Sequence, residues 1–219
     1  TFVPSVVERD HGQTYVHIMR NGNSIYAVIS GKITFADIAG HWAQADIESL
    51  ASRLLLQGQG PDRFAPDAVI TRAEVAAMLV RALGLTDGPA IGAAAYTDVS
   101  PDAWYAPYIQ LASAAGLISG YLDGSFRPDQ AVSRVELAAM TARALGYAGA
   151  DLSADASVLN AFADHEKIAG WARPSVATVA EAGIIHGKPD GRFAPEESAT
   201  RAEAAVILKR ALLELNFIN

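Results

Sequence analysis

The chain of 219 residues contains no cysteine, which excludes disulfide cross-links, thiol nucleophiles and thiolate metal sites. It also has no apolar run near the roughly 20 residues that a membrane-spanning helix requires. No leader with a charged start, an apolar stretch and small residues stands at Thr1, so the compartment cannot be read from a signal peptide. We therefore expect the sequence to begin within a longer protein.

Positive charge is scarce as well. The formal net charge of −7 argues against a general binder of nucleic acid or anionic membranes, because clustered positive charge holds those partners. Any site for an anion must therefore be local. Hydrophobic residues make up 51% of the chain and charged residues 19%, which excludes a disordered tail.

Metal-binding motifs are also missing from the sequence. The histidines show no ligand spacing such as His-Glu-x-x-His and do not repeat in phase. Asp123-Gly124 and Asp190-Gly191 lack the alternating acidic ligands of a calcium loop. We expect neither a metal site nor a cofactor.

What the sequence does contain is an internal repeat. Thr71-Arg72-Ala73-Glu74 returns as Ser133-Arg134-Val135-Glu136 and as Thr200-Arg201-Ala202-Glu203, at spacings of 62 and 67 residues. The same spacings relate one tryptophan, one glycine, one phenylalanine and one proline of each copy: Trp42, Trp104 and Trp171; Gly58, Gly120 and Gly187; Phe64, Phe126 and Phe193; Pro66, Pro128 and Pro195.

Each copy predicts two helices joined by a loop. An aromatic-x-Asp element precedes the first helix, whose apolar stripe in the first copy is Ile47, Leu50 and Leu54. Gly116 and Gly183 are predicted to end this helix in the other copies, in a left-handed conformation. The second helix starts at the tetrad, where Ser or Thr followed three residues later by Glu forms a capping box.

The second helix carries apolar residues at a helical period in all three copies, interrupted only by Thr141. We predict a mainly α fold in which the three second helices form a central three-helix core with pseudo-threefold symmetry. The repeats span residues 33–84, 95–146 and 161–214, and the stretches 85–95 and 147–161 are predicted linkers. Residues 1–32 are predicted to form a β-hairpin, or the end of a preceding domain, with its turn at Asn21-Gly22.

Taken in order, these elements resemble S-layer homology (SLH) domains in three tandem copies, over about residues 33–214. The resemblance implies a pseudo-trimeric helical module of secreted proteins from Gram-positive and related bacteria. It further implies non-covalent binding of a secondary cell-wall polysaccharide, commonly bearing pyruvate ketals on N-acetylmannosamine, in grooves between repeats. The expected location is extracellular, at the cell wall or S-layer.

The same resemblance makes the tetrad arginine a principal ligand contact. Arg72, Arg134 and Arg201 each follow a helix cap, where backbone N–H groups and the helix dipole favour an anion and disfavour an unpaired cation. A guanidinium can hold a ketal carboxylate with two hydrogen bonds. The further predicted ligand-binding residues are Gly58, Gly120, Gly187, Trp42, Trp104, Trp171, Tyr105, Tyr121, Lys188 and Asp98.

Plainer readings stand beside these predictions. The arginines could be exposed or structurally paired charges. Packing in the core is the default for the tryptophans, and the alternative is a mixed role with one edge buried and one edge facing the groove. Asp37, Asp98 and Asp164 are expected chiefly to accept hydrogen bonds from backbone near the first helix, and the tetrad glutamates to cap helices rather than to catalyse. We predict a binding protein that is not an enzyme; the alternative is a segment of an S-layer lattice subunit that mainly contacts neighbouring subunits.

The first copy departs from the other two in the loop before its second helix. It has Pro61-Asp62 where the others have Asp-Gly, so its turn must differ and its groove is expected to be weakened.

Overall fold

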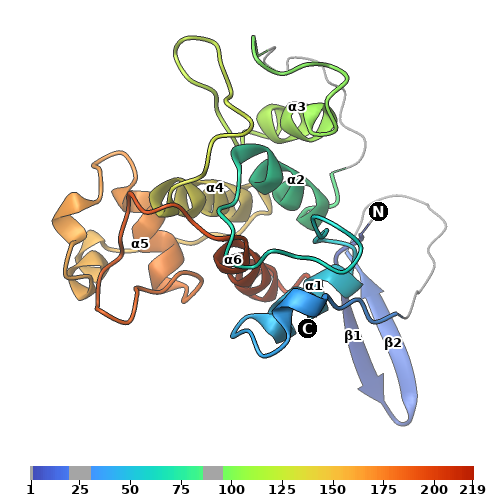
Figure 1. Cartoon of the computed structure of the whole chain (residues 1–219). Coiled ribbons are helices and arrows are strands. Elements are labelled where there is room, and N and C mark those ends of the chain that lie inside the picture. The colour runs from blue at the N-terminus through green and yellow to red at the C-terminus, as the bar shows by residue number, and fades with distance from the viewer. Residues whose placement is uncertain (1, 20–30, 86–95) are drawn as a thin grey trace.

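The computed structural model describes residues 2–19, 31–85 and 96–219, and it is mainly helical (Figure 1). Each repeat supplies two α-helices, and short 3-10 helices lie at Ala36–Ile38, Ala156–Ala161 and His165–Lys167. No helix among the described residues is both long enough and apolar enough to cross a membrane. The α-helices are α1 (Gln44–Ser52), α2 (Arg72–Ala82), α3 (Ala106–Ala114), α4 (Arg134–Tyr147), α5 (Arg173–Glu181) and α6 (Arg201–Glu214).

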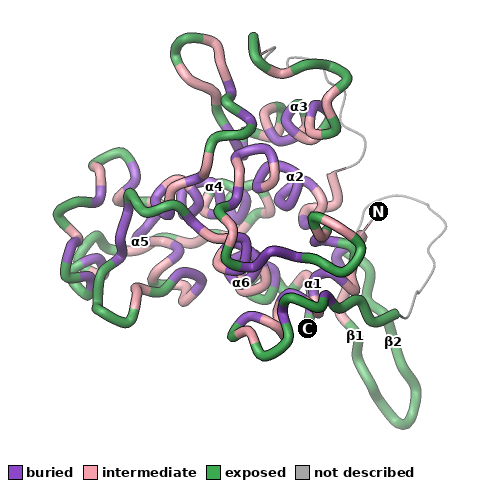
Figure 2. The backbone as a smooth tube through the Cα atoms, viewed as in Figure 1, coloured by how far each residue is buried: buried purple, intermediate pink, exposed green. Residues whose placement is uncertain are grey.

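The second helices of the repeats, α2, α4 and α6, contact one another at the centre of the molecule. Each first helix packs on the second helix of the preceding repeat: α3 on α2, α5 on α4 and α1 on α6. The last of these contacts joins repeat 1 to repeat 3 and closes the arrangement. The predicted pseudo-threefold core is therefore confirmed, and Figure 2 shows the buried residues concentrated along these central helices.

The capping boxes predicted for the three second helices are all present. At each one the hydroxyl of the cap accepts from the N–H of the glutamate three residues later, and the glutamate accepts from the N–H of the cap. Nine residues of each of these helices are buried, because each helix is covered by its two sister helices and by a first helix. Thr141 is buried too, and its hydroxyl donates to the Leu137 carbonyl at 2.8 Å.

A closed triangle of backbone hydrogen bonds lies just before the central helices. The N–H of Ile70 donates to the Ala199 carbonyl, Ala199 donates to Val132, and Val132 donates back to Ile70, at 2.8–3.0 Å. These residues occupy the same position in the three repeats and are fully buried. Since each bond joins a different pair of repeats, the three repeats are fixed in a ring rather than in an open row.

An N-terminal hairpin is present among the described residues, ahead of the turn predicted at Asn21-Gly22. Strands β1 (Ser5–Asp10) and β2 (Gln13–Ile18) pair antiparallel, with Ser5 opposite Ile18. The turn is His11-Gly12, and both residues have positive φ, as a two-residue hairpin turn requires. Asn21-Gly22 lies outside the described residues.

Leu54, predicted to belong to the buried stripe of the first helix, lies beyond the end of that helix. Leu54 follows the end of α1, has φ +62° and is half exposed, whereas the next residue, Leu55, is fully buried. Leu54 takes the position of Gly116 and Gly183, whose φ values are +70° and +65°. The predicted glycine ends are confirmed, and the first copy adopts the same left-handed turn with a leucine.

The stretch 147–161, predicted as a linker, is partly ordered structure. Helix α4 runs to Tyr147, and the 3-10 helix Ala156–Ala161 packs on α5 through the fully buried Leu159. Because small and acidic residues dominate this stretch, the sequence did not indicate that Leu159 packs in the core.

Replacing Leu54 by glycine is expected to stabilise the chain. The left-handed conformation costs an L-residue roughly 1–2 kcal/mol, and the greater freedom of glycine in the unfolded chain returns part of this. We expect a gain of about 0.5–1 kcal/mol in the free energy of unfolding, measured by urea denaturation. The matched control is Leu55→Ala, which removes a buried side chain and should cost about 2–4 kcal/mol. A Leu54→Gly variant less stable than the parent would contradict the conclusion that the left-handed conformation of Leu54 costs stability.

Candidate functional site

The three tetrad arginines are almost fully buried and reach from one repeat into the next. Arg72 donates through Nε to the Phe126 carbonyl at 2.9 Å and through Nη2 to the Ser119 carbonyl at 2.8 Å. Its Nη1 lies 3.4 Å from a carboxylate oxygen of Glu136. Arg134 makes the same contacts with Phe193, His186 and Glu203, and Arg201 makes them with Phe64, Gln57 and Glu74. Each arginine thus joins two repeats.

This pairing corrects the electrostatic argument made from the sequence. The first two helical N–H groups of α2 donate to the carbonyls of Gln130 and Pro128 in repeat 2, and the equivalent groups of α4 and α6 donate likewise to the next repeat. These N–H groups are therefore not open to an external anion. The guanidinium at the helix start is neutralised by a glutamate of the protein, so the structurally paired reading of the arginines holds whatever else they bind.

Both oxygens of each tetrad glutamate are engaged. In Glu74, Oε2 accepts from the Thr71 N–H at 2.9 Å and Oε1 accepts from Arg201. Glu136 and Glu203 repeat the pattern with their own caps and with Arg72 and Arg134. A carboxylate held in this way is a structural cap and ion-pair partner.

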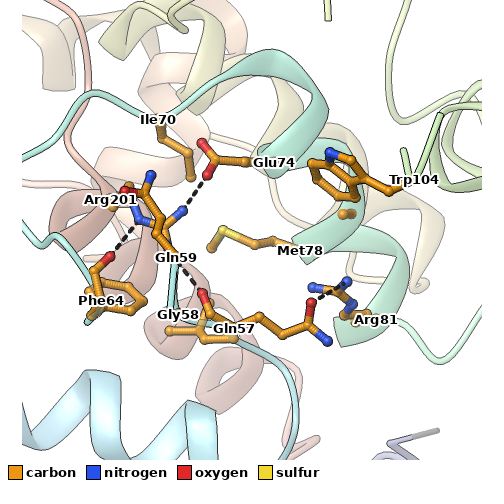
Figure 3. Close-up of a pocket in the computed structure, with 12 residues that line it drawn as sticks. Gln57, Gly58, Gln59, Phe64, Ile70, Glu74, Met78, Arg81, Trp104 and Arg201 are labelled. Atoms are coloured by element: carbon orange, nitrogen blue, oxygen red, sulfur yellow. Dashed lines mark hydrogen bonds and ion pairs between the residues drawn. The ribbon is translucent and has the colours of Figure 1, made fainter. Parts of the chain in front are cut away.

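A groove opens beside each arginine, and Figure 3 shows the one at Arg201. Each groove combines an arginine of one repeat, the loop and second helix of the next, and the tryptophan of the third. Their volumes are about 370 Å³, 210 Å³ and 490 Å³ for grooves 1, 2 and 3. Groove 1 contains Arg201, Gln57, Gly58, Met78 and Trp104; groove 2 contains Arg72, Ser119, Gly120, Tyr121, Met140 and Trp171; groove 3 contains Arg134, His186, Gly187, Lys188, Ile207 and Trp42.

The tryptophans stand at the groove walls, not in the core, so the default reading of core packing was wrong. Trp42, Trp104 and Trp171 are 65%, 57% and 61% exposed. Each sits just before a first helix that packs on the preceding repeat, which carries the indole to the neighbouring groove. In Figure 3 Trp104 lies across the groove from Arg201.

The repeated glycines have a packing reason as well as a place in the grooves. A Cβ on Gly120 would lie 2.3 Å from the Tyr96 ring and 2.7 Å from the Ser125 carbonyl oxygen, and a Cβ on Gly58 would meet Phe35 and Arg63 at 2.6 Å. Around Gly187 the same contacts are 3.1 Å. The aromatic residue of the aromatic-x-Asp element therefore packs directly against the glycine of the loop. This contact fixes the position of the loop backbone that lines the groove.

The aspartates of that element accept hydrogen bonds from backbone, as the plainer reading predicted. The partners, however, lie in the loop before the second helix: Asp98 accepts from the N–H groups of Phe126 and Arg127, both at 2.7 Å. Asp37 and Asp164 bind the equivalent pairs. With both oxygens so engaged, Asp98 stands apart from the three grooves.

The remaining predicted residues are placed as follows. Tyr121 lines groove 2 and stacks between two guanidiniums, with its ring centre 4.9 Å from Arg72 and 4.0 Å from Arg127. Lys188 lines groove 3 and forms an ion pair with Glu197. Tyr105 packs against the core and against Trp104 rather than on a groove wall.

Sequence reasoning missed a second set of arginines in the grooves. Arg81, Arg143 and Arg210 lie on the second helices and line grooves 1, 2 and 3. Each stands nine residues after a tetrad arginine, so the repeat spacing itself carried the signal. We call them the outer arginines.

The loop at groove 1 keeps one backbone hydrogen bond of the other copies despite its different turn. The N–H of Gln59 donates to the Arg63 carbonyl at 2.8 Å, and Tyr121 and Lys188 donate in the same way to Ser125 and Arg192. Gly124 and Gly191 have positive φ in the later copies, where the first copy has Asp62.

Removing a tetrad arginine is expected to damage the fold. Arg134→Ala leaves a partly buried glutamate and two carbonyls without their donor, so the free energy of unfolding should fall by about 3–5 kcal/mol. The measurement is urea denaturation followed by circular dichroism. Arg143→Ala on the same helix is the control: this side chain is exposed, and its loss should change stability by less than about 0.5 kcal/mol. Equal stabilities of the two variants would rule out the buried ion-pair role.

The loop aspartates predict a loss of stability in acid. Burial acts to raise the pKa of Asp98, but the N–H groups of Phe126 and Arg127 outweigh it and hold the pKa below its ordinary value of 3.8; Asp37 behaves alike. Because the folded pKa is the lower one, the stabilisation is complete above pH 3.8 and is lost as the pH falls through the folded value. Urea unfolding between pH 7 and pH 2 should show this decline.

An Asp37→Asn, Asp98→Asn variant checks the assignment. It should lose about 1 kcal/mol per site at pH 7, since an amide offers one oxygen to two donors, and it should lose less stability in acid than the parent. Asp129→Asn, which changes an exposed carboxylate, is the matched control. The same acid slope in parent and double variant would be evidence against these aspartates.

Comparison with known proteins identifies the family to which this arrangement belongs. The S-layer homology domain family matches residues 34–76, 95–138 and 161–205. The chain is 38% identical to an amylopullulanase of Thermoanaerobacterium thermosulfurigenes, over 84% of the chain and 10% of that protein. It is 36% identical to exoglucanase XynX of Acetivibrio thermocellus (86% and 17%) and 31% identical to a cellulosome-anchoring protein of the same species (72% and 35%).

The chain spans only a small part of these relatives, from a tenth to about a third of their length. Proteins with different enzyme names and an anchoring protein therefore share this region, while the rest of each lies outside it. Together with the closed ring of three equivalent repeats, the matched segments show that the chain belongs to the S-layer homology domain family and carries three consecutive copies of the domain.

Proposed function

We propose that this chain is a non-catalytic module that anchors an extracellular bacterial surface protein to a cell-wall polysaccharide. The observation that carries the proposal is the threefold groove: a buried arginine, a backbone loop, an outer arginine and an exposed indole recur together three times. Relatives that share the region include a cellulosome-anchoring protein and a surface layer protein of Brevibacillus choshinensis. Attachment at the cell surface is the function that such different proteins could have in common.

A sugar suits the chemistry of these grooves. An exposed indole offers a flat apolar face and one N–H donor, and the loop and arginines supply polar groups around it. Three grooves around one axis also suit a polymer, because several weak sites on one scaffold gain avidity without a tight single site.

The ligand is proposed to be acidic, with a pyruvate ketal as the recognised group. Each tetrad arginine lines a groove and uses one N–H of Nε, Nη1 and Nη2 for the protein, so two of its five N–H groups have no partner among the described residues. The outer arginine adds a second guanidinium. With the tetrad glutamate already neutralised, each groove has an excess of positive charge despite the acidic chain.

The state of the carboxylates in the grooves supports binding without catalysis. Hydrolysis of a glycosidic bond requires two carboxyl groups free to act on the substrate. The glutamate in each groove is held on both oxygens by a cap N–H and an arginine. This supports a binding module over a glycan hydrolase.

Calorimetric titration of the whole chain with pyruvylated wall polysaccharide, and with the same polymer stripped of its ketals, tests the proposal. Binding should require the ketal. Trp104→Ala should weaken the affinity of its groove by about 1 kcal/mol, roughly fivefold, while the fold remains stable because the indole is exposed.

The other outcomes are equally informative. Equal binding of both polymers would keep the anchor and reject recognition of the carboxylate. No heat with either polymer, together with self-association of the chain in sedimentation, would replace the anchor by an S-layer subunit that contacts its neighbours.

A further inference from the structure

The outer arginines differ in the hydrogen bonds that they make within the protein. In groove 1, Nη2 of Arg81 donates to Gln57 Oε1 and to the Tyr108 hydroxyl, both at 3.1 Å, and the guanidinium stacks 4.7 Å from the centre of the Tyr108 ring. In groove 3, Arg210 donates to the Ile184 carbonyl at 3.3 Å. Arg143 in groove 2 is exposed and has no hydrogen bond or ion pair with any residue that the structure describes.

The repeat alignment explains the difference. The positions of Gln57 and Tyr108 are taken by Ser119 and Ser175 in the copies that build groove 2. A serine side chain has neither the length of glutamine nor a ring on which a guanidinium can stack. Groove 2 has therefore lost both groups that hold the outer arginine in groove 1.

Groove 2 has the same two guanidiniums and one engaged glutamate as groove 1, but its outer arginine is not held by the protein residues that the structure describes. Arg72 and Arg143 both line it, and its Glu136 is already engaged on both oxygens. Groove 3 has a further cation in Lys188, but Glu197 pairs with it. Groove 2 is also the smallest of the three, at about 210 Å³, so an anion inside it lies close to both walls.

We infer that Arg143 binds an anionic group of the ligand and makes groove 2 the groove with the highest affinity for an acidic sugar. The inference rests on the proposed function and names the groove and the residue that set its charge selectivity. The guanidinium fork suits a carboxylate, which accepts two parallel N–H bonds. The sugar ring would lie against Trp171, on the opposite repeat.

The chain has a built-in reporter for each groove. It contains three tryptophans, Trp104 in groove 1, Trp171 in groove 2 and Trp42 in groove 3. In the ¹⁵N-labelled chain, the three indole N–H signals should each follow one groove during a titration. The probe is monomeric N-acetylmannosamine with and without a pyruvate ketal, because a single sugar removes avidity.

With the ketal sugar, the Trp171 signal should move at the lowest concentration. Arg143→Ala should raise the Kd reported by Trp171 about two- to fivefold, as expected for one exposed charged contact, and leave the Kd values reported by Trp104 and Trp42 unchanged. In the matched comparison, Arg81→Ala should raise the Kd reported by Trp104 by a smaller factor than Arg143→Ala raises the Kd reported by Trp171, since the Arg81 guanidinium already donates to Gln57 and Tyr108.

Exchanging the side chains that hold the outer arginine between grooves 1 and 2 tests the inference without removing either arginine. Gln57→Ser with Tyr108→Ser should release Arg81 and strengthen groove 1, and Ser119→Gln with Ser175→Tyr should hold Arg143 and weaken groove 2. With the ketal-free sugar, none of these substitutions should change the Kd reported by any indole signal.

The results that would overturn the inference differ from those that would overturn the function. If the ketal sugar shifts the indole signals but Arg143→Ala leaves the Trp171 Kd unchanged, the inference is wrong and the anchor function stands. If the ketal sugar shifts no indole signal while the pyruvylated polymer also gives no heat, the proposed function fails and the inference fails with it.

Discussion

The structure depends on the closure of the ring between the third repeat and the first. Arg201 reaches across this junction to the Phe64 and Gln57 carbonyls and to Glu74, over more than 120 residues of sequence. The Ile70–Ala199 bond and the α1–α6 contact close the same junction. An open row of three repeats would have two such interfaces and would leave one arginine and one helix face without partners. Closure satisfies all of them and makes the three interfaces equivalent.

Closure also makes the grooves depend on one another. Because each groove takes its arginine, its loop and its tryptophan from three different repeats, no single repeat contains a whole site. The tetrad arginines hold the repeats together and line the grooves at once. A loss of binding on removing one of them would therefore not distinguish a ligand contact from a broken interface, whereas the exposed tryptophans and Arg143 separate the two effects.

Much of this fold was predictable from the sequence because its signals are local. Capping boxes, the helical period and Gly116 and Gly183 each depend on a few neighbouring residues. The partners of Arg72 and the exposure of Trp42 were not predictable in this way, since both follow from which repeat packs against which. Leu54 was misread for a different reason: a leucine adopted the backbone that its sister repeats give to glycine.

The choice of arginine at the interface links stability to binding. A lysine ammonium could not reach two carbonyls and a carboxylate in one plane, whereas the guanidinium does so with three of its five N–H groups and keeps its charge when buried. Burial lowers the pKa of Arg201, and Glu74 counteracts that effect. The unused N–H groups are then rigidly oriented by the same bonds that hold the repeats together. Since this arrangement is common to all three grooves, differences between them must come from residues outside the interface, and Ser119 and Ser175 beside Arg143 are such a difference.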